Sequence, residues 1–219
     1  MKKWFMLVVM TVGMLCCTSC GNANTQIQSA SITLNTADDV KAALISGNEQ
    51  YATSGINEGD ISKERREDTA TNGQHPYAVV ITCSDSRVPV EHVFNAGIGD
   101  LFVIRTAGNV IGEYELGSVE YGVDHLGTKL VVVLGHTNCG AVAATLEGGG
   151  HGAVKAITDE IASCLPEECT ATEAEILNVE NSIAAINSSE VMQELTADGS
   201  VKVVGAIYDI STGKVEFLD

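Results

Sequence analysis

The chain has 219 residues, which suits one domain of ordinary size with at most a short appendage. Hydrophobic residues make up 45% of it, enough for a packed core, so a disordered or fibrous protein is excluded. Lysine and arginine number 12 against 29 aspartates and glutamates, which gives a net charge of -17. Because so acidic a chain repels phosphate groups, we expect neither nucleic-acid binding nor electrostatic docking on anionic lipid.

The first residues have the layout of a leader for export. Lys2 and Lys3 precede an almost wholly apolar run from Trp4 to Leu15, and small residues follow it. This pattern is typical of a secretory signal peptide, and the apolar run is too short to span a bilayer of about 30 Å comfortably. We therefore predict a signal peptide over residues 1–19; the alternatives are a short membrane anchor or a buried helix.

The predicted cleavage point contains a lipidation signal. Residues 17–20 (CTSC) resemble a bacterial lipobox, in which small residues precede a cysteine that is lipidated, although Cys17 stands where leucine is usual. We expect a lipidated Cys20 with a flexible tether over residues 20–36, and one folded domain over residues 37–219. Lipid on Cys20 would place the protein in the periplasm or cell envelope, with the acyl chains as its membrane contact.

Taken in chain order, the apolar pattern predicts an α/β domain. An amphipathic helix is predicted over 37–51, and a polar connection with one short helix over 54–73. Buried strands follow over 77–82, 101–104 and 130–134, with a helix over 117–126, further helices near 152–164 and 172–197, and a terminal hairpin from 201–210 and 214–218. This order predicts a mostly parallel sheet of four to five strands flanked by helices, with the C-terminal hairpin supplying an edge strand.

Two of the predicted strands run into loops that contain cysteine. Cys83 follows the first strand, and His136 and Cys139 follow the third strand, three residues apart. In a parallel sheet both loops lie at the carboxyl-terminal edge, so two thiolates and one imidazole can converge on one metal ion. Such a set predicts a tetrahedral zinc site whose fourth position stays open, as in catalytic rather than structural sites.

Other interpretations of these loops fit less well. Each cysteine alone is more often a small buried hydrophobe. A phosphatase loop needs a cysteine and an arginine six residues apart, whereas Cys83 and Arg87 are four apart, and neither loop contains the C-x-x-C of a thioredoxin-like site. The remaining histidines are expected at the surface or in caps rather than on the metal: His75, His92, His125 and His151.

Five segments together resemble the β-class carbonic anhydrases in order and spacing, over about residues 37–218. They are 83–89 (CSDSRVP), 99–109 (GDLFVIRTAGN), 118–121 (SVEY), 135–141 (GHTNCGA) and 204–209 (VGAIYD). The resemblance implies one Zn²⁺ per chain, held by Cys83, His136 and Cys139, and reversible hydration of carbon dioxide to bicarbonate and a proton by zinc-bound hydroxide. It also implies an obligate homodimer, or a dimer of dimers, with active sites near the subunit interface.

Asp85 and Arg87 follow Cys83 by two and four residues, so both are expected to border the metal. We expect Arg87 to pair with Asp85 and keep it ionised, so that Asp85 accepts a hydrogen bond from the zinc-bound water or hydroxide and orients it. The alternative is a surface ion pair that caps the loop. Val80 stands where some family members have the tryptophan of an inhibitory bicarbonate site, so we expect an accessible zinc with Asp85 off the metal.

The substrate pocket is expected to be small and mostly apolar, because carbon dioxide carries no charge. By resemblance three side chains line it and two groups donate hydrogen bonds in it: Phe102, Ala107 and Tyr121, with Gln74 and the backbone N–H of Gly140. The alternative for the two aromatic residues is ordinary core packing.

Two further cysteines, Cys164 and Cys169, flank a short segment that contains Pro166. In an exported protein such a pair can close a small-loop disulfide if its Cα atoms lie within about 7 Å, and we expect one here; the alternative is two free thiols. The rival to an enzyme is a zinc-holding relative without hydratase activity, acting as a binding or scaffold protein. Asp85 and Gln74 favour the enzyme, because a zinc store would not need them.

Overall fold

The structure is a computed structural model, and it describes residues 34–218. The predicted signal peptide and the predicted lipidation site at Cys20 lie outside the described residues, as does most of the predicted tether. Within residues 34–218, no helix combines the length and the apolar character needed to cross a bilayer.

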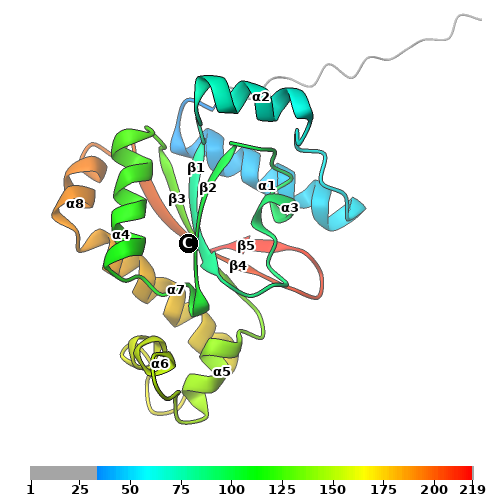
Figure 1. Ribbon diagram of the computed structural model, residues 1–219. Coiled ribbons are helices and arrows are strands. Elements are labelled where there is room, and N and C mark those ends of the chain that lie inside the picture. Colours follow the sequence, from blue (N-terminus) through cyan, green and yellow to red (C-terminus); the bar gives the residue numbers. More distant parts are fainter. Residues whose placement is uncertain (1–33, 219) are drawn as a thin grey trace, which may run out of the picture. The chain divides into compact units, whose positions relative to one another are not determined.

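A five-stranded sheet forms the centre of the domain (Figure 1). Its strands are β1 (Ala78–Cys83), β2 (Leu101–Thr106), β3 (Leu130–His136), β4 (Lys202–Tyr208) and β5 (Val215–Phe217), in the order β2-β1-β3-β4-β5. The first four strands are parallel, and β5 pairs antiparallel with β4. The predicted mostly parallel sheet with a C-terminal hairpin is therefore confirmed. β1 and β3 are buried along their whole length, which explains their continuous apolar runs.

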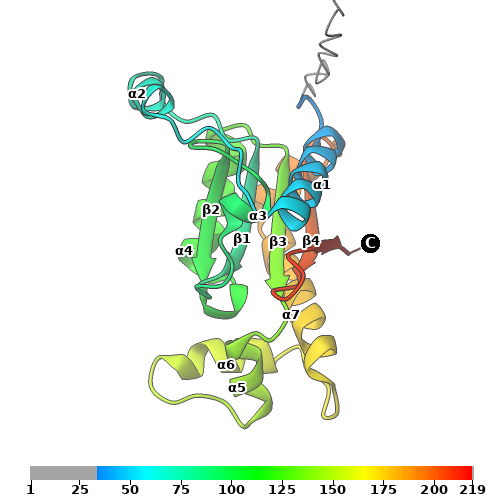
Figure 2. The same cartoon turned by 90° about the vertical axis from the view of Figure 1, so that its right-hand side faces the viewer.

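Helices cover both faces of the sheet. One face packs against α1 (Ala37–Ser54) and the short α3 (Val90–Val93); the other packs against α4 (Glu113–Glu120), its continuation η2 (Tyr121–His125), α7 (Ala171–Asn187) and α8 (Glu190–Thr196). In Figure 2, α5 (Gly140–Leu146) and α6 (Val154–Ala162) lie below the carboxyl ends of the strands, and α2 (Lys63–Asn72) lies beyond their amino ends. The turn η1 (Ala107–Asn109) directly follows β2.

Local sequence explains where α1 begins and ends. The Thr36 hydroxyl accepts a hydrogen bond from the Asp39 N–H at 3.1 Å, and the Asp39 carboxylate accepts one from the Thr36 N–H at 3.0 Å. Val40 and Leu44, four residues apart, are buried against the sheet. Gly55 ends the helix in the left-handed conformation at φ 68°. The predicted amphipathic helix is confirmed, with three more residues at its C-terminal end.

The structure differs from the prediction in the shorter elements. The stretch predicted as helical over 172–197 is two helices, because α7 ends at Asn187 and Ser189 begins a new one by accepting a hydrogen bond from the Met192 N–H at 3.2 Å. The helix predicted over 117–126 begins four residues earlier, at Glu113. A short helix between the first two strands is expected from the element order, and α3 is that helix. No residue range is predicted for α3 or α5, since four and seven residues are too few for a clear apolar period.

Candidate metal centre

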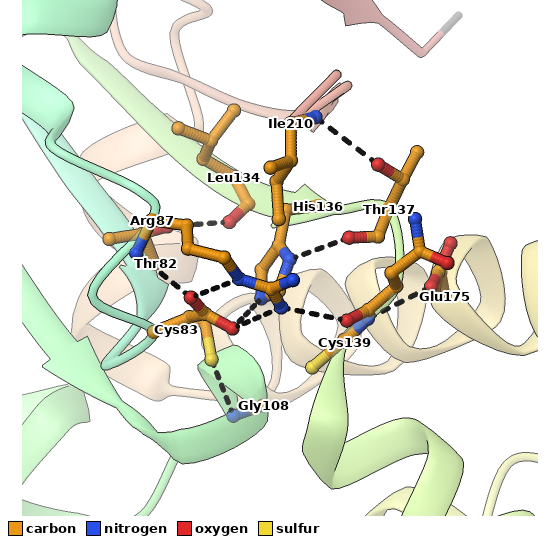
Figure 3. A network of polar contacts seen from close by, with 12 residues as sticks. Thr82, Cys83, Arg87, Gly108, Leu134, His136, Thr137, Cys139, Glu175 and Ile210 are labelled. Atoms are coloured by element: carbon orange, nitrogen blue, oxygen red, sulfur yellow. Dashed lines mark hydrogen bonds and ion pairs between the residues drawn. The ribbon is translucent and has the colours of Figure 1, made fainter.

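Three predicted ligands meet at the carboxyl-terminal edge of the sheet (Figure 3). Cys83 is the last residue of β1, His136 is the last residue of β3, and Cys139 directly precedes α5. Because β1 and β3 are parallel neighbours, their carboxyl ends lie side by side. The two sulfur atoms and one imidazole nitrogen lie within 4.8 Å of one another, and all three residues are buried. The convergence predicted from the two loops is therefore present.

The donor set fits zinc. The ring Nδ1 of His136 lies 3.0 Å from the Thr137 carbonyl oxygen, which accepts a hydrogen bond when Nδ1 carries the proton. The other ring nitrogen, Nε2, is buried and has no hydrogen-bond partner, so its lone pair is free for a metal. Two sulfurs and one imidazole nitrogen are a usual catalytic zinc set, in which the protein leaves the fourth tetrahedral position open.

The pKa values of the two thiols shift in opposite directions, so Cys83 loses its proton more readily than Cys139. The pKa of Cys83 is lowered, first by a hydrogen bond from the Cys139 thiol and further by its contacts with His136 and Gly108, against the opposing effect of burial. That same contact with Cys83, together with burial, raises the pKa of Cys139. The pKa of His136 is raised because the Cys83 thiolate and the Thr137 carbonyl outweigh the effect of burial, which lowers it. A divalent cation held by these three residues would replace the thiol protons, because zinc binds cysteine as thiolate.

The predicted ion pair between Asp85 and Arg87 is formed. Arg87 Nε donates to Asp85 Oδ1 at 2.9 Å, and a terminal Arg87 nitrogen donates to Asp85 Oδ2 at 2.7 Å. Arg87 also donates to the Asn138 carbonyl at 3.0 Å, which ties the first cysteine loop to the second. The side-chain and backbone hydrogen bonds from Arg87 hold the pKa of Asp85 well below its usual range. Asp85 Oδ2 lies 3.9 Å from His136 Nε2, so an ionised carboxylate borders the ligands while Arg87 holds it.

A backbone donor also supports the first sulfur. The N–H of Gly108, in η1, donates to Cys83 Sγ at 3.2 Å. Gly108 has φ 68°, and a Cβ atom added to it would lie 2.9 Å from Ile161 Cδ1 and 3.0 Å from Ala141 Cβ. Both the left-handed backbone and the close packing therefore require glycine at this position.

Not every predicted pocket residue lies near the metal ligands of the same chain. Ala107 directly precedes Gly108, and Gly140 directly follows Cys139 as the first residue of α5, so both lie beside the ligands. Phe102 pairs with Val79 in the sheet, whereas Cys83 pairs with Thr106 four residues further along β2. At about 3.3 Å per residue this places Phe102 roughly 13 Å along the strand from the site.

The other two predicted pocket residues accompany Phe102. The centroid of the Tyr121 ring lies 5.9 Å from that of the Phe102 ring, and Tyr121 is 44% exposed. Gln74 is exposed and precedes β1, at the strand end opposite Cys83. Within one chain, the pocket predicted from all five residues is therefore not assembled around the metal ligands.

The remaining histidines and cysteines of residues 34–218 lie outside the cluster of metal ligands. All four other histidines are exposed, as expected. Cys164 and Cys169 are free thiols, so the structure does not contain the predicted disulfide. Each thiol instead donates to a carbonyl near it in the chain: Cys164 Sγ to Ile161 at 3.1 Å, at the end of α6, and Cys169 Sγ to Thr170 at 3.5 Å, at the start of α7.

Three residues beside the site carry no role in the sequence predictions. Arg105, from β2, donates to the Asp85 carbonyl at 2.7 Å. Glu175, from α7, accepts the Cys139 N–H at 3.1 Å, and Asn178, one turn later, donates to the Gly108 carbonyl at 2.7 Å. The sequence offers one signal for the two α7 residues: they are polar, yet the helical period places them on the buried face, next to Ala174 and Val179.

Comparison with known proteins agrees with this geometry. Residues 78–215 match the family model described as carbonic anhydrase. A carbonic anhydrase of Mycolicibacterium smegmatis is 37% identical over 190 residues (81% of this chain and 88% of the relative), and carbonic anhydrase 2 of Mycobacterium tuberculosis is 36% identical over 188 residues (81% and 90%). The crystal structure of the β-carbonic anhydrase CafA of Aspergillus fumigatus superposes with a TM-score of 0.63 at 30% identity, covering 82% of this chain and 91% of that one. A tetrameric β-carbonic anhydrase of Sordaria macrospora superposes with a TM-score of 0.62 at 26% identity, covering 83% and 97%.

The chain belongs to the carbonic anhydrase family, in its β class. It is a zinc-dependent lyase that interconverts carbon dioxide and bicarbonate. The resemblance seen in the five sequence segments is confirmed.

Proposed function

We propose that the carbon dioxide hydration of this chain depends on Asp85 as the hydrogen-bond acceptor that orients the reacting water, with Arg87 as the residue that fixes Asp85. The observation that carries the proposal is the two-point contact of Arg87 with Asp85, at 2.9 and 2.7 Å, beside the imidazole of His136. When bound, zinc supplies a Lewis acid that makes water a nucleophile near neutral pH.

The other groups of the site keep this arrangement in place. Because Asp85 stays ionised, its carboxylate oxygens can only accept hydrogen bonds, so a water between Asp85 and the ligands must point a proton toward it. The remaining lone pairs of that water then face the open side of the site, where carbon dioxide approaches. Arg87 donates to both carboxylate oxygens and fixes the carboxylate, while Oδ2 accepts only one of these hydrogen bonds and keeps a lone pair for the water.

A stopped-flow assay with a pH indicator tests this function on the zinc-loaded protein. We expect turnover well above background near pH 8.5, and a rate about 10- to 100-fold lower for Asp85→Asn at unchanged zinc content. Absence of turnover in the wild-type protein would leave the zinc-holding scaffold as the better description. Loss of zinc from Asp85→Asn would show instead that Asp85 supports the metal.

We further propose that a second copy of the chain completes the substrate pocket. β2 is an edge strand of the sheet, and near its amino end Phe102 and the half-exposed Tyr121 offer apolar surface away from their own metal ligands. Gln74 precedes the neighbouring strand. The tetrameric state that is stated for the Sordaria macrospora relative supports an oligomer, and a homodimer or dimer of dimers would bring these residues to the partner's site.

Mixing two variants of strongly reduced activity tests this arrangement. Asp85→Asn affects the chain that holds the metal, and Phe102→Ala affects the chain that supplies the pocket. If the pocket comes from the partner, a mixed dimer has one site with both changes and one site with neither, so random reassembly restores about a quarter of the wild-type activity. If the pocket forms within one chain, every site of the mixed dimer carries one change and mixing restores nothing.

We propose, finally, that the protein is exported and anchored by lipid. The support is the sequence: a signal-peptide pattern over residues 1–19 and the lipobox-like CTSC that ends at Cys20. We expect the mature protein to begin at a lipidated Cys20 and to fractionate with membranes, and Cys20→Ala to lose the lipid mass. An intact mass that includes residues 1–19 without acyl chains would contradict the anchor.

A further inference from the structure

Helix α7 presents buried polar side chains to the metal centre, although it packs mainly against the apolar core. Glu175, Asn178 and Ser182 are spaced three and four residues apart, so they lie on one face of the helix. Their exposed fractions are only 6%, 1% and 2%. Buried polar groups on a core helix are costly unless they are hydrogen-bonded, so their partners indicate what they are for.

All three side chains bond backbone groups next to the sulfur ligands, either at Cys139 itself or in η1, whose Gly108 N–H donates to Cys83. Glu175 Oε1 accepts the N–H of Cys139 at 3.1 Å, as Figure 3 shows. Asn178 Nδ2 donates to the Gly108 carbonyl at 2.7 Å, and the Ser182 hydroxyl donates to the Asn109 carbonyl at 2.9 Å. One helix face therefore contacts the Cys139 loop directly and supports Cys83 through η1.

These contacts lead to each sulfur atom by a short path. Glu175 fixes the backbone of the ligand Cys139 itself. Asn178 fixes Gly108, whose own N–H donates to Cys83 Sγ at 3.2 Å. The position of both sulfurs thus depends on two side chains that are one helical turn apart.

The loops that α7 holds have an unfavourable backbone. Asn138, directly before Cys139, has φ 56°, and Asn109, directly after Gly108, has φ 48°. A left-handed conformation is uncommon for residues other than glycine and persists where surrounding contacts impose it. The hydrogen bonds from α7 are contacts of that kind.

From this geometry we infer that Glu175 and Asn178 are positioning residues: α7 holds the Cys83 and Cys139 sulfurs at the spacing that zinc requires. The inference rests on the zinc site and goes beyond the proposed roles of Asp85 and the partner chain. Without these hydrogen bonds the two loops relax, and the zinc ligands separate more easily.

Zinc retention tests the inference independently of carbon dioxide hydration. The zinc-loaded protein is mixed with an excess of a chromophoric chelator, and the rate of zinc release is measured. Glu175→Ala and Asn178→Leu should release zinc about 10- to 100-fold faster, because changing residues that orient metal ligands typically lowers metal affinity by that factor. Glu175→Gln keeps an acceptor oxygen for the Cys139 N–H, so it should stay within a few-fold of the wild type.

A matched control lies on the same helix. The Asn181 side chain donates to Glu160 Oε1 at 3.0 Å and is hydrogen-bonded to neither the Cys139 loop nor η1, so Asn181→Ala should release zinc at the wild-type rate. The melting temperature is measured with and without zinc for each variant. A positioning role reduces the increase that zinc produces, whereas a merely structural role lowers both melting temperatures equally.

Two results would overturn the inference. One is an unchanged zinc-release rate in Glu175→Ala. Glu175 lines a cavity of about 550 Å³, so its truncation should disturb the packing little, and this variant tests the inference even if Asn178→Leu does not fold. The other is equally fast release from Glu175→Gln and Glu175→Ala, because a hydrogen bond to the Cys139 N–H would then not be the cause.

Discussion

Arg87→Met separates the catalytic from the structural value of the ion pair with Asp85. The substitution removes both contacts with the Asp85 carboxylate and the 3.0 Å contact with the Asn138 carbonyl, while methionine keeps most of the unbranched stem. The side chain of Arg87 is 50% exposed and that of Asp85 is 15% exposed. Solvent screens such a pair, so its loss should cost at most about 1 kcal/mol of stability, or roughly 2–4 °C in Tm.

The expected effect on the reaction is larger than the effect on stability. Without the Arg87 guanidinium the Asp85 carboxylate keeps the hydrogen bond from the backbone N–H of residue 87 to Oδ1, at 2.9 Å, but Oδ2 is no longer held. The acceptor that faces the reacting water is then less well fixed. Changing a residue that orients groups around a zinc site typically lowers activity about 10- to 100-fold. We therefore expect kcat/KM to fall by that factor, which corresponds to about 1.4–2.8 kcal/mol of transition-state stabilisation. Stopped-flow hydration, zinc content and thermal unfolding are measured on the same preparation.

The exposed pair of Lys155 and Asp159 on α6 provides the control, because Lys155→Met removes an ion pair that contacts no ligand. This control should leave both rate and stability near the wild type. An Arg87→Met protein that keeps its full rate would refute the orienting role of Asp85. A loss of several kcal/mol in stability would show instead that Arg87 mainly holds the two loops together.

Three further predictions concern the ligands and their support. Cys139→Ala should lose zinc and activity together, measured by elemental analysis and stopped flow; full zinc occupancy in this variant would contradict the ligand assignment. Because the pKa of Cys83 is lowered, the zinc-free protein should keep one thiolate as the pH falls below the ordinary thiol range of about 8.5, seen as ultraviolet absorbance that disappears only well below pH 7. Cys83→Ser should lack that absorbance, and an ordinary titration near pH 8.5 in the wild type would be inconsistent with the hydrogen bond from Cys139. Gly108→Ala should lower stability by roughly 2–4 kcal/mol, because of its positive φ and the crowding by Ala141, and a normal denaturation midpoint would count against that packing.

The sequence predicts best what repeats along the chain or depends on chain order. Continuous apolar runs mark β1 and β3 because both faces of those strands are covered. The parallel order then places Cys83 and His136 at one edge before any coordinates are known. The helix predicted over 37–51 begins where α1 begins, but α1 continues to Ser54, before the left-handed Gly55.

What the sequence does not predict depends on contacts between distant segments. Asn178 is one polar residue in a helix, and its value appears only when the fold places it 2.7 Å from the Gly108 carbonyl, 70 residues away. The break at Ser189 is a single capping contact that the helical period hides. Gln74 and Phe102 resemble pocket residues, but in one chain they lie toward the strand ends opposite Cys83, so the sequence alone does not tell how they would reach a metal site.

X-ray absorption at the zinc K-edge of the purified protein tests the three-ligand site most directly. Coordination by Cys83, His136 and Cys139 predicts one zinc per chain with two sulfur atoms at about 2.3 Å, one imidazole nitrogen at about 2.0 Å and one further light atom. Cys139→Ala should reduce the sulfur count of any zinc that remains to one. A site with three or more sulfurs, with none, or with no zinc in carefully purified protein would contradict the assignment.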